Sequence, residues 1–327
     1  MAQAPTTPEF SLIERIRARA GVRDDVLLGI GDDAAIVRPP AGMELAICCD
    51  TLIAGRHFPE DTAAADIGWK SLAVNLSDLA AMGAQPAWAT LALSLPDADA
   101  DWLDDFLDGF CELADQHHVA LIGGDTTRGP LVITVTVHGL LPAGSALRRD
   151  CAGINEDIWV TGTLGDAAGG LRQWQGGGLQ SAKLRYRLDR PTPRVDVGLA
   201  LRALASAAID LSDGLAADLG HILARSGVGA QIDLGRLPTS RTLAEHFPDE
   251  AARWGLQLAG GDDYELCFVA PAAQALAIEQ ALSDCDVTAT VIGRITREPG
   301  LELLQPDGDV FTLVEPGFDH FARGMPN

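Results

Sequence analysis

The chain has 327 residues, 47% of them hydrophobic, which is enough for two domains with substantial cores. It carries 46 acidic and 24 basic residues, a formal net charge of -22, and its only lysines are Lys70 and Lys183. No basic cluster is present to bind a phosphate backbone, so nucleic acid is not expected as a partner. No apolar run is long enough for a membrane span, and the first residues lack the pattern of a signal peptide, which predicts a cytoplasmic protein.

The first half of the chain alternates predicted strands with predicted helices. A capping box at Ser11 and Glu14 predicts a helix that ends at Gly21. Amphipathic patterns predict two further helices over 65–83 and 99–118, the first with Gly83 as its C-terminal cap. Short apolar runs predict strands over 25–31, 34–37, 43–50, 89–95, 119–124 and 131–139.

This pattern breaks over 142–153, and the domain boundary is predicted there, giving domains 1–145 and 146–327. Beyond it, the glycine-rich segment 169–180 predicts a mobile surface loop, and 305–309 predicts a turn between two short strands. Helices are predicted after 194 and over 212–227, where Ser212 is expected to cap the second helix. Strands are predicted over 157–162, 207–210 and 229–234. Because both halves mix strand and helix, the fold class is α/β or α+β with two domains.

The stretch GIGDDA places Asp32 and Asp33 directly after a glycine turn. It nearly fits the dinucleotide fingerprint, with Asp50 near the spacing of a ribose-binding acid. That interpretation fails, because two carboxylates would occupy positions whose backbone must approach an anionic pyrophosphate, and no clear helix follows. The phosphate-loop pattern with its Gly-Lys pair and the protein-kinase signatures are also absent from the sequence.

Aspartates recur at strand ends and in glycine turns along the whole chain. Any one of them alone is most simply a turn former or a helix cap. Carboxylates that converge on one cleft repel each other and raise each other's pKa unless cations neutralise them. The set therefore predicts Mg²⁺ held against a polyphosphate, since Mg²⁺ prefers carboxylate and phosphate oxygens. The aspartates are Asp32, Asp33, Asp50, Asp78, Asp125, Asp210, Asp213, Asp262 and Asp263.

With these motifs in place, the chain resembles the thiamine-monophosphate kinase family, within the ATP-binding superfamily that includes aminoimidazole ribonucleotide synthetase. The matching segments run in order from near residue 29 to near residue 321, almost the whole chain. The stretches AGRHF, NLSDLAAMGAQPAW and GGDDYEL are more particular to the kinase than to the superfamily. The segments are GIGDDAAIV, DTLIAGRHF, KSLAVNLSDLAAMGAQPAW, LIGGDTTRGP, VTGTLGD, AIDLSDGLAADLGHI, GGDDYELCF and GFDHF.

The resemblance implies phosphorylation of thiamine monophosphate to thiamine diphosphate by direct in-line transfer from ATP, with several Mg²⁺ ions. It also implies a fold in which the N-terminal domains of two subunits share a barrel, so a homodimer is expected. Residues 1–145 would bind ATP and Mg²⁺ and mediate dimerisation, and residues 146–327 would complete the active site. ATP and thiamine monophosphate are the implied partners.

Site residues follow from the resemblance by position. The implied metal ligands are Asp33, Cys49, Asp50, Asp78, Asp125, Asp210 and Asp213, among which Asp125, Asp210 and Asp213 are the catalytic set. The implied ATP contacts are Gly124, Asp125, Arg149 and Ser212, and the implied substrate contacts are His57, Asp262 and Phe318.

The chain departs from the family pattern at two places. Cys48 and Cys49 stand where the family commonly has Ser or Thr, and a thiol is a poor Mg²⁺ ligand, so a backbone carbonyl is the group that could still serve there. Asp262 stands where many relatives carry Glu, which shortens its reach by one methylene. Two alternatives stay open: an enzyme like aminoimidazole ribonucleotide synthetase, and a non-catalytic sensor of Mg²⁺ and nucleotide supported by the cysteine pair.

Overall fold

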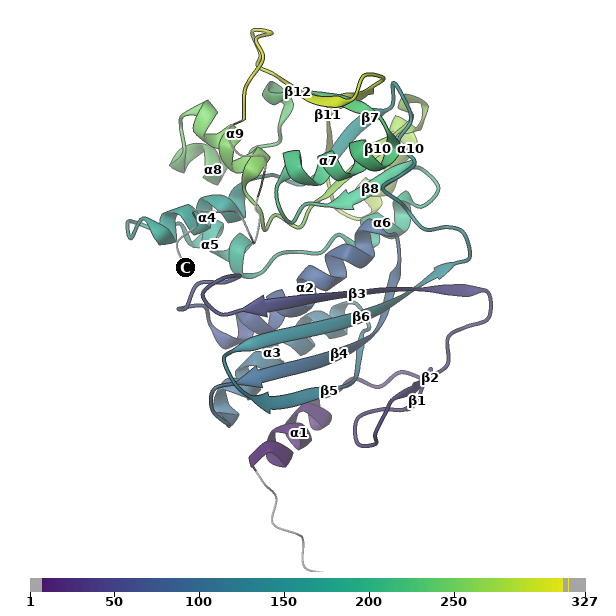
Figure 1. The fold of residues 1–327 in the computed structure, drawn as a ribbon, viewed down its shortest axis with the longest axis vertical. Helices are drawn as coiled ribbons and strands as arrows, with labels where there is room; N and C mark the ends of the chain where they lie inside the picture. Colours follow the sequence, from purple (N-terminus) through teal and green to yellow (C-terminus); the bar gives the residue numbers. More distant parts are fainter. Residues whose placement is uncertain (1–7, 314–316, 318–327) are drawn as a thin grey trace, which may run out of the picture. The chain divides into compact units, whose positions relative to one another are not determined.

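The computed structural model describes residues 8–313 and residue 317, so Phe318 lies outside the described residues. The chain divides into two compact units. Unit 1 runs to Leu79 and includes Ala84–Ala146, whereas unit 2 comprises Ala80–Gly83 and the chain from Leu147 onward. Both units combine helices with β-sheet, which confirms the mixed α/β class (Figure 1). In the described part of the chain, no helix has the length and apolar character needed to cross a membrane.

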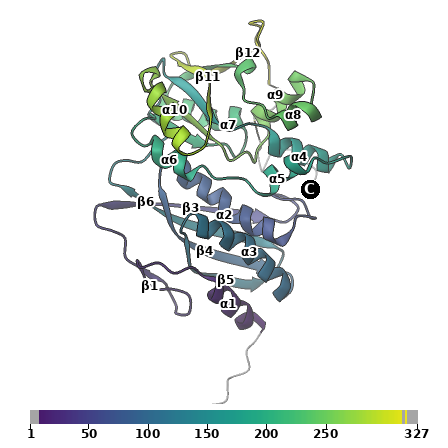
Figure 2. The ribbon, with the colours of Figure 1, turned by 180° about the vertical axis from the view of Figure 1, so that it is seen from behind.

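Unit 1 is built on a four-stranded sheet with strand order β3-β6-β4-β5. Strands β4 and β5 pair in parallel, and the other two pairs are antiparallel. Helices α2 and α3 lie against one face of this sheet (Figures 1 and 2). We call the opposite face, which no helix among the described residues of unit 1 covers, the open face. The elements are α1 (Pro8–Arg19), β1 (Val26–Leu28), β2 (Ile36–Val37), β3 (Met43–Ile53), α2 (Ala64–Ala81), β4 (Gln85–Leu95), α3 (Ala100–Gln116), β5 (Ala120–Arg128) and β6 (Val132–Pro142).

Local sequence explains how α2 and α3 end and how they pack. Gly83 follows α2 in the left-handed region (φ 64°), as predicted. The Asp99 side chain caps α3 by accepting from two backbone N–H groups. The two helices cross closely at Gly68 and Gly109, because a Cβ at Gly109 would lie 1.7 Å from the carbonyl oxygen of Ala65. Helix α1 was placed too late by its capping box: it begins at Pro8, before the predicted cap residue.

Unit 2 is built on a six-stranded sheet with order β12-β9-β11-β7-β10-β8, antiparallel except for β12 and β9. Alternate residues of β7 face opposite sides. Ile158 and Val160 enter a core that includes residues of α7 and α9, whereas Trp159 stacks on Phe268 (5.9 Å between ring centroids) on the other side. The elements are β7 (Asp157–Thr161), α4 (Asp166–Gln175), α5 (Ala182–Asp189), α6 (Val195–Leu201), β8 (Ala207–Asp210), α7 (Leu215–Ser226), β9 (Gly229–Asp233), η1 (Leu234–Arg236), α8 (Arg241–His246), α9 (Glu250–Ala259), β10 (Leu266–Ala270), η2 (Ala272–Gln274), α10 (Ala275–Asp284), β11 (Ala289–Thr296) and β12 (Gly300–Leu304).

The glycine-rich segment 169–180 is not a surface loop throughout, so that prediction was wrong. Residues up to Gln175 belong to α4, and both Gly169 and Gly170 are buried within it. A Cβ at Gly170 would lie 2.6 Å from the carbonyl oxygen of Leu184, so glycine here permits close packing of α4 against α5. Only the stretch that follows Gln175 connects the two helices as a loop.

Candidate functional site

The strongest cluster of predicted site residues in unit 2 lies where β8 ends at Asp210 and α7 begins at Leu215. The Asp218 side chain, one turn into α7, organises the connecting loop. Its Oδ2 accepts hydrogen bonds from the backbone N–H groups of Ser212, Asp213 and Gly214 at 3.1, 3.0 and 3.1 Å. Asp218 therefore does for this helix what Ser212 was expected to do, since Gly214 occupies the N-cap position and contributes no side-chain bond.

Three carboxylates are concentrated in this segment. Asp210 and Asp218 are 4% and 3% exposed, and Asp213 is half-buried. Burial, with the charge of Asp210 next, raises the pKa of the Asp218 carboxyl to about 8, although the N–H donors of Asp213 and Gly214 oppose the shift. The segment therefore has an excess of negative charge that a cation would relieve.

A second loop, residues 261–264, docks against this segment. The N–H of Asp262 donates to the carbonyl of Ser212 (2.9 Å), and the N–H of Tyr264 donates to the carbonyl of Leu211 (2.8 Å). A Cβ at Gly261 would lie 2.3 Å from the Ser212 oxygen, so only glycine allows this approach. The structure thereby brings the predicted substrate residue Asp262 beside the predicted metal and ATP residues of unit 2.

The docked loop contains unusual backbone. Asp262 and Tyr264 both lie in the left-handed region, with φ of 67° and 49°. Non-glycine residues in sparsely populated conformations each cost about 1–3 kcal/mol and persist only where surrounding contacts enforce them. We refer to residues 261–264 as the substrate loop, because Asp262 is its predicted substrate contact.

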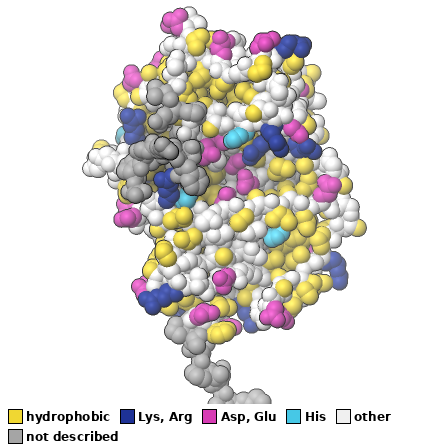
Figure 3. Space-filling view, viewed as in Figure 1, with side chains coloured by type: hydrophobic (Ala, Val, Ile, Leu, Met, Phe, Trp, Pro, Cys, Tyr) yellow, Lys and Arg dark blue, Asp and Glu magenta, His cyan; other side chains and the backbone are white. Residues whose placement is uncertain are grey.

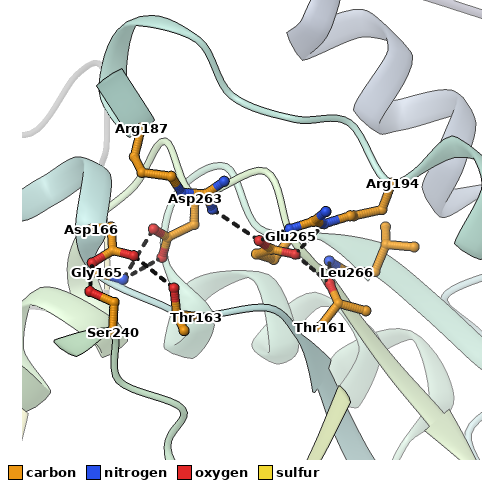
Figure 4. Close-up of polar contacts among 10 residues, drawn as sticks. All are labelled: Thr161, Thr163, Gly165, Asp166, Arg187, Arg194, Ser240, Asp263, Glu265 and Leu266. Atoms are coloured by element: carbon orange, nitrogen blue, oxygen red, sulfur yellow. Dashed lines mark hydrogen bonds and ion pairs between the residues drawn. The ribbon is translucent and has the colours of Figure 1, made fainter. Parts of the chain in front are cut away.

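Directly after the substrate loop, Glu265 is fully buried and bound on three sides (Figure 4). Its carboxylate accepts from Nε and Nη2 of Arg194 (2.6 and 2.5 Å), from Nη2 of Arg187 (2.9 Å) and from Oγ1 of Thr161 (2.7 Å). Burial alone would raise the pKa of the Glu265 carboxyl, but Arg194, Arg187 and Thr161 together hold it below the ordinary value. Neither Glu265 nor either arginine was predicted from the sequence as a site residue.

Asp263 forms a second anchor of the same loop (Figure 4). Both of its carboxylate oxygens accept from the N–H of Gly165, at 3.0 and 2.8 Å, at the start of α4. Burial raises the pKa of the Asp263 carboxyl well above its ordinary value. Next to it, Asp166 accepts from the hydroxyl groups of Thr163 and Ser240. The motifs VTGTLGD and GGDDYEL therefore interlock, which gives both a structural role in addition to any role with substrate.

In unit 1, Asp50 lies on β3 beside α2. Its N–H donates to Oδ1 of Asn75 (3.1 Å), and the Asn75 side chain donates to the carbonyl of Ser71 (3.0 Å). The thiol of Cys48, two residues earlier on the same face, contacts the Asn75 carbonyl (3.4 Å). Cys49 lies between them on β3, so its exposed side chain points to the open face, away from the Asp50 side chain.

Gly124 and Asp125 lie on β5, three strands from β3. Cross-strand pairing runs from Asp50 through Val135 and Leu91 to Gly124, so this row spans about 14 Å at the usual strand spacing. The adjacent row pairs Thr51, Thr134, Ala92 and Asp125, and a hydrogen bond of 2.8 Å joins the hydroxyl groups of Thr51 and Thr134 on the open face. Asp125 is therefore turned to the open face, whereas Asp50 is turned to α2.

Only glycine is compatible with the backbone at position 124. Its φ is 154°, and a Cβ would lie 1.8 Å from the carbonyl oxygen of Leu91. The conformation of β5 at the GGD sequence therefore depends on this glycine.

The remaining predicted residues occupy separate places. Asp33 is exposed and donates its N–H to the Asp32 side chain (2.9 Å), and Asp78 is half-buried on α2. Nδ1 of His57 accepts from the N–H of Ile53 (2.9 Å), which leaves the proton of the neutral ring on Nε2. Arg149 is exposed in unit 2.

Gly317 packs against the start of α7, where a Cβ would lie 2.6 Å from Cβ of Ala217 and 2.9 Å from the carbonyl oxygen of Asp213, and Phe318 follows it outside the described residues. Among residues 8–313 and 317, no three His, Cys, Asp or Glu side chains form a ready group for a metal ion.

Comparison with known proteins identifies the family. Two family models match: AIR synthase related protein, N-terminal domain, over residues 31–141, and AIR synthase related protein, C-terminal domain, over residues 155–304. Thiamine-monophosphate kinase of Escherichia coli (strain K12) is 51% identical over 324 residues, which cover 96% of this chain and 98% of that protein. The chain belongs to the thiamine-monophosphate kinase family. The same family's protein from Haemophilus influenzae is 42% identical with the same coverage. The family and the enzyme class expected from the sequence are confirmed.

Solved structures agree with this membership of the thiamine-monophosphate kinase family. The crystal structure of thiamine-monophosphate kinase from Stenotrophomonas maltophilia K279a has a TM-score of 0.86 and 57% identity, and covers 93% of this chain and 98% of that one. AaThiL complexed with AMPPCP and TMP has a TM-score of 0.75 and 28% identity, with coverage of 98% and 99%. Hydrogenase maturation protein HypE of E. coli, at 20% identity and a TM-score of 0.75, shares the fold.

Proposed function

We propose that the protein transfers the terminal phosphoryl group of ATP to thiamine monophosphate, in line and with Mg²⁺, to form thiamine diphosphate. The family supplies the substrate pair, since its member AaThiL has been solved with AMPPCP and TMP. The observation that carries the proposal is the docking of the substrate loop on the acidic segment 210–213, because it holds Asp262, the proposed substrate contact, next to Asp210 and Asp213, the proposed metal ligands. A cytoplasmic location stays a prediction.

The donor set in unit 2 fits Mg²⁺. Asp210 and Asp213 offer hard oxygen ligands. Burial first, and then the charge of Asp210, raise the pKa of the Asp218 carboxyl, and a divalent cation would relieve the second of these effects. Mg²⁺ usually takes one or two carboxylates and completes its shell with phosphate oxygens and water, so a group of three protein ligands is not needed.

The proposed metal ligands of unit 1 cannot all share one ion. Asp50 and Asp125 are separated by about three strand spacings, or 14 Å, and are turned to opposite faces of their sheet. We therefore propose more than one Mg²⁺, with Asp33, Asp50 and Asp78 also among the ligands. At Cys49 we propose the backbone carbonyl as the ligand, since its thiol points to the open face.

The chemistry places modest demands on the protein. The acceptor is a phosphate monoester with a second pKa of about 6, so it is already a nucleophile at neutral pH and needs no general base. Bound Mg²⁺ would screen the repulsion between the two polyanions and stabilise the charge on the transferred group. The protein's own task is to orient the two substrates: Gly124, Arg149 and Ser212 toward ATP, and His57, Asp262 and Phe318 toward thiamine monophosphate.

We also propose a homodimer formed through the open face of unit 1. This face exposes Leu45, Ile47 and Ile53 at 44%, 59% and 42%, and Figure 3 shows few charged side chains across it. Asp125 shares the face, so in such a dimer its carboxylate would point toward the partner subunit and could serve an ATP site across the interface.

A direct assay tests the function. Purified protein is incubated with ATP, Mg²⁺ and thiamine monophosphate, and the products are separated chromatographically. We expect thiamine diphosphate and equimolar ADP, abolished by Asp210→Asn and retained in Asp249→Asn. The control residue caps α9 through its side chain, a role that Asn fills equally well.

Parallel arms distinguish the alternatives. Turnover of the aminoimidazole ribonucleotide precursor alone would favour the synthetase-like enzyme. Binding of Mg²⁺ and ATP without any turnover would favour the sensor. Phosphorylation of free thiamine instead of its monophosphate would contradict the proposed acceptor.

A further inference from the structure

We propose that Glu265, clamped by Arg187 and Arg194, is a positioning residue that sets the place of Asp262 and thereby the affinity for thiamine monophosphate. The inference rests on the proposed function, which makes Asp262 a substrate contact. Glu265 itself is 0% exposed and cannot touch a bound substrate, so any effect it has must pass through its neighbours.

The conformation of the substrate loop must be enforced by surrounding contacts. Asp262 and Tyr264 are held in the left-handed region, which L residues rarely adopt. Hydrogen bonds to the carbonyls of Leu211 and Ser212 hold the loop against the segment 210–213. Without a second set of anchors, the chain at Asp262 can relax to an ordinary conformation and its carboxylate then points elsewhere.

Two side chains of the same motif, Asp263 and Glu265, anchor the loop to other helices. Asp263 is tied to the N–H of Gly165 at the start of α4. Glu265 is tied to Arg187 near the end of α5 and to Arg194 at the start of α6. Asp262 lies immediately before these anchors, so helices that are far away in sequence fix its position.

The residues at the end of β7 fit closely around the Glu265 carboxylate. A Cβ at Gly162 would lie 2.2 Å from its Oε1, so this position needs glycine both for space and for its φ of 58°. Oγ1 of Thr161 donates to Glu265 and accepts from the N–H of Leu266 (2.8 Å), which joins the carboxylate to β10. Glutamate is therefore fitted to its site by charge, by hydrogen bonds and by shape.

Removing the negative charge of Glu265 would disturb the substrate loop through Arg187 and Arg194. Arg187 lies between Asp263 and Glu265 and also acts electrostatically on Asp263 (Figure 4). With Gln at position 265, the two guanidinium groups lose their carboxylate and are drawn to the acids of the substrate loop. The loop then shifts, and the contact with thiamine monophosphate is lost while the ATP contacts of the chain are retained.

A double-mutant cycle tests this inference. Initial rates of the full-length protein are measured for Glu265→Gln, Asp262→Asn and the double variant, with thiamine monophosphate and ATP varied separately. Misplacement of a binding group by about 1 Å can cost about 100-fold, so we expect each single variant to raise KM for thiamine monophosphate by about 10- to 100-fold. KM for ATP should change by less than about twofold, and the double variant should resemble the worse single variant, because both act on one contact.

Three controls separate positioning from general damage. Glu302→Gln removes an exposed carboxylate whose partner is Gln231, in the same unit, and should leave both KM values unchanged. Glu265→Asp keeps the charge and should recover part of the lost affinity. Arg187→Gln leaves the bonds between Arg194 and Glu265 intact, so it can test the positioning role even if Glu265→Gln does not fold. It should also raise KM for thiamine monophosphate selectively.

Each outcome has one meaning. Multiplicative effects in the double variant, or equal changes in both KM values, would overturn the role of Glu265 as a positioning residue for Asp262 while leaving the kinase activity established by the wild type. A wild-type protein that makes no thiamine diphosphate would instead refute the proposed function, and the positioning role would be refuted with it. A selective, non-multiplicative rise in KM supports both.

Discussion

Replacing Arg194 with Met should destabilise the protein far more than the loss of an arginine from an exposed ion pair. Arg194 gives Glu265 two charge-assisted hydrogen bonds, and the Glu265 side chain is 1% exposed, so its charge has no access to water. Bonds to charged groups contribute roughly 1.5–3 kcal/mol each. Breaking a buried pair costs about 3–5 kcal/mol. Because Arg187 remains bonded, we expect about 3 kcal/mol.

Urea denaturation followed by tryptophan fluorescence and far-UV circular dichroism measures this loss. Arg241→Gln is the matched control, since Arg241 pairs with Glu245 at 91% and 58% exposure and should lower the free energy of unfolding by less than about 0.5 kcal/mol. Adding Glu265→Gln to Arg194→Met should cost less than the sum of the two single variants, because both substitutions remove the same ion pair. A loss below about 1 kcal/mol for Arg194→Met, or a double variant as costly as the sum of its parts, would refute the reasoning.

Three further predictions follow from other features. Folding lowers the pKa of Glu265 from 4.5, so its ionised form contributes stability that is complete above about pH 4.5 and is lost as the pH falls through the folded-state pKa. The melting temperature, measured between pH 3 and 7, should therefore fall less steeply with acid in Glu265→Gln than in the wild type. Gly124→Ala should weaken binding of a fluorescent ATP analogue by at least about tenfold, because its Cβ meets backbone at 1.8 Å, whereas Gly178→Ala, with nothing within 4 Å, should bind normally. Ile47→Glu should give a monomer by light scattering, whereas Leu276→Glu, which lies in unit 2 and is more exposed (79% against 59%), should not; a dimeric Ile47→Glu would contradict the open-face interface.

Elements whose limits are set by neighbouring residues were predictable from the sequence. Gly83 ends α2 and Asp99 begins α3 through contacts within a few residues, and both roles are visible in the sequence pattern. The conformation of 169–175 is different, because it depends on packing against Leu184 in the next helix. Consecutive glycines predict a loop when no partner is known, but in contact with another helix they provide close approach.

The same distinction holds at the site. Asp210 and Asp213 stood out because they follow an apolar strand and precede a helix, which is a local pattern. Asp218 was missed because its partners are backbone groups of the preceding loop, and an aspartate in the first turn of a helix is ordinary. Glu265 and Arg194 are 71 residues apart, and nothing in one sequence indicates that they meet. The sequence does show that Glu265 lies within the otherwise apolar run YELCFVA, and an acid in such a run indicates a buried, paired carboxylate.

The cysteine pair at 48–49 now has a structural explanation that weakens the sensor alternative. Strand alternation turns Cys49 to the open face, away from Asp50, so replacing Ser or Thr there by Cys removes no side-chain oxygen beside that carboxylate. Cys48 shares the face of Asp50, but its thiol contacts the Asn75 carbonyl, as a hydroxyl group at this position would. The backbone carbonyl is unchanged by either substitution. The departure from the family pattern therefore leaves the proposed oxygen donors in place, and loss of catalysis does not follow from it.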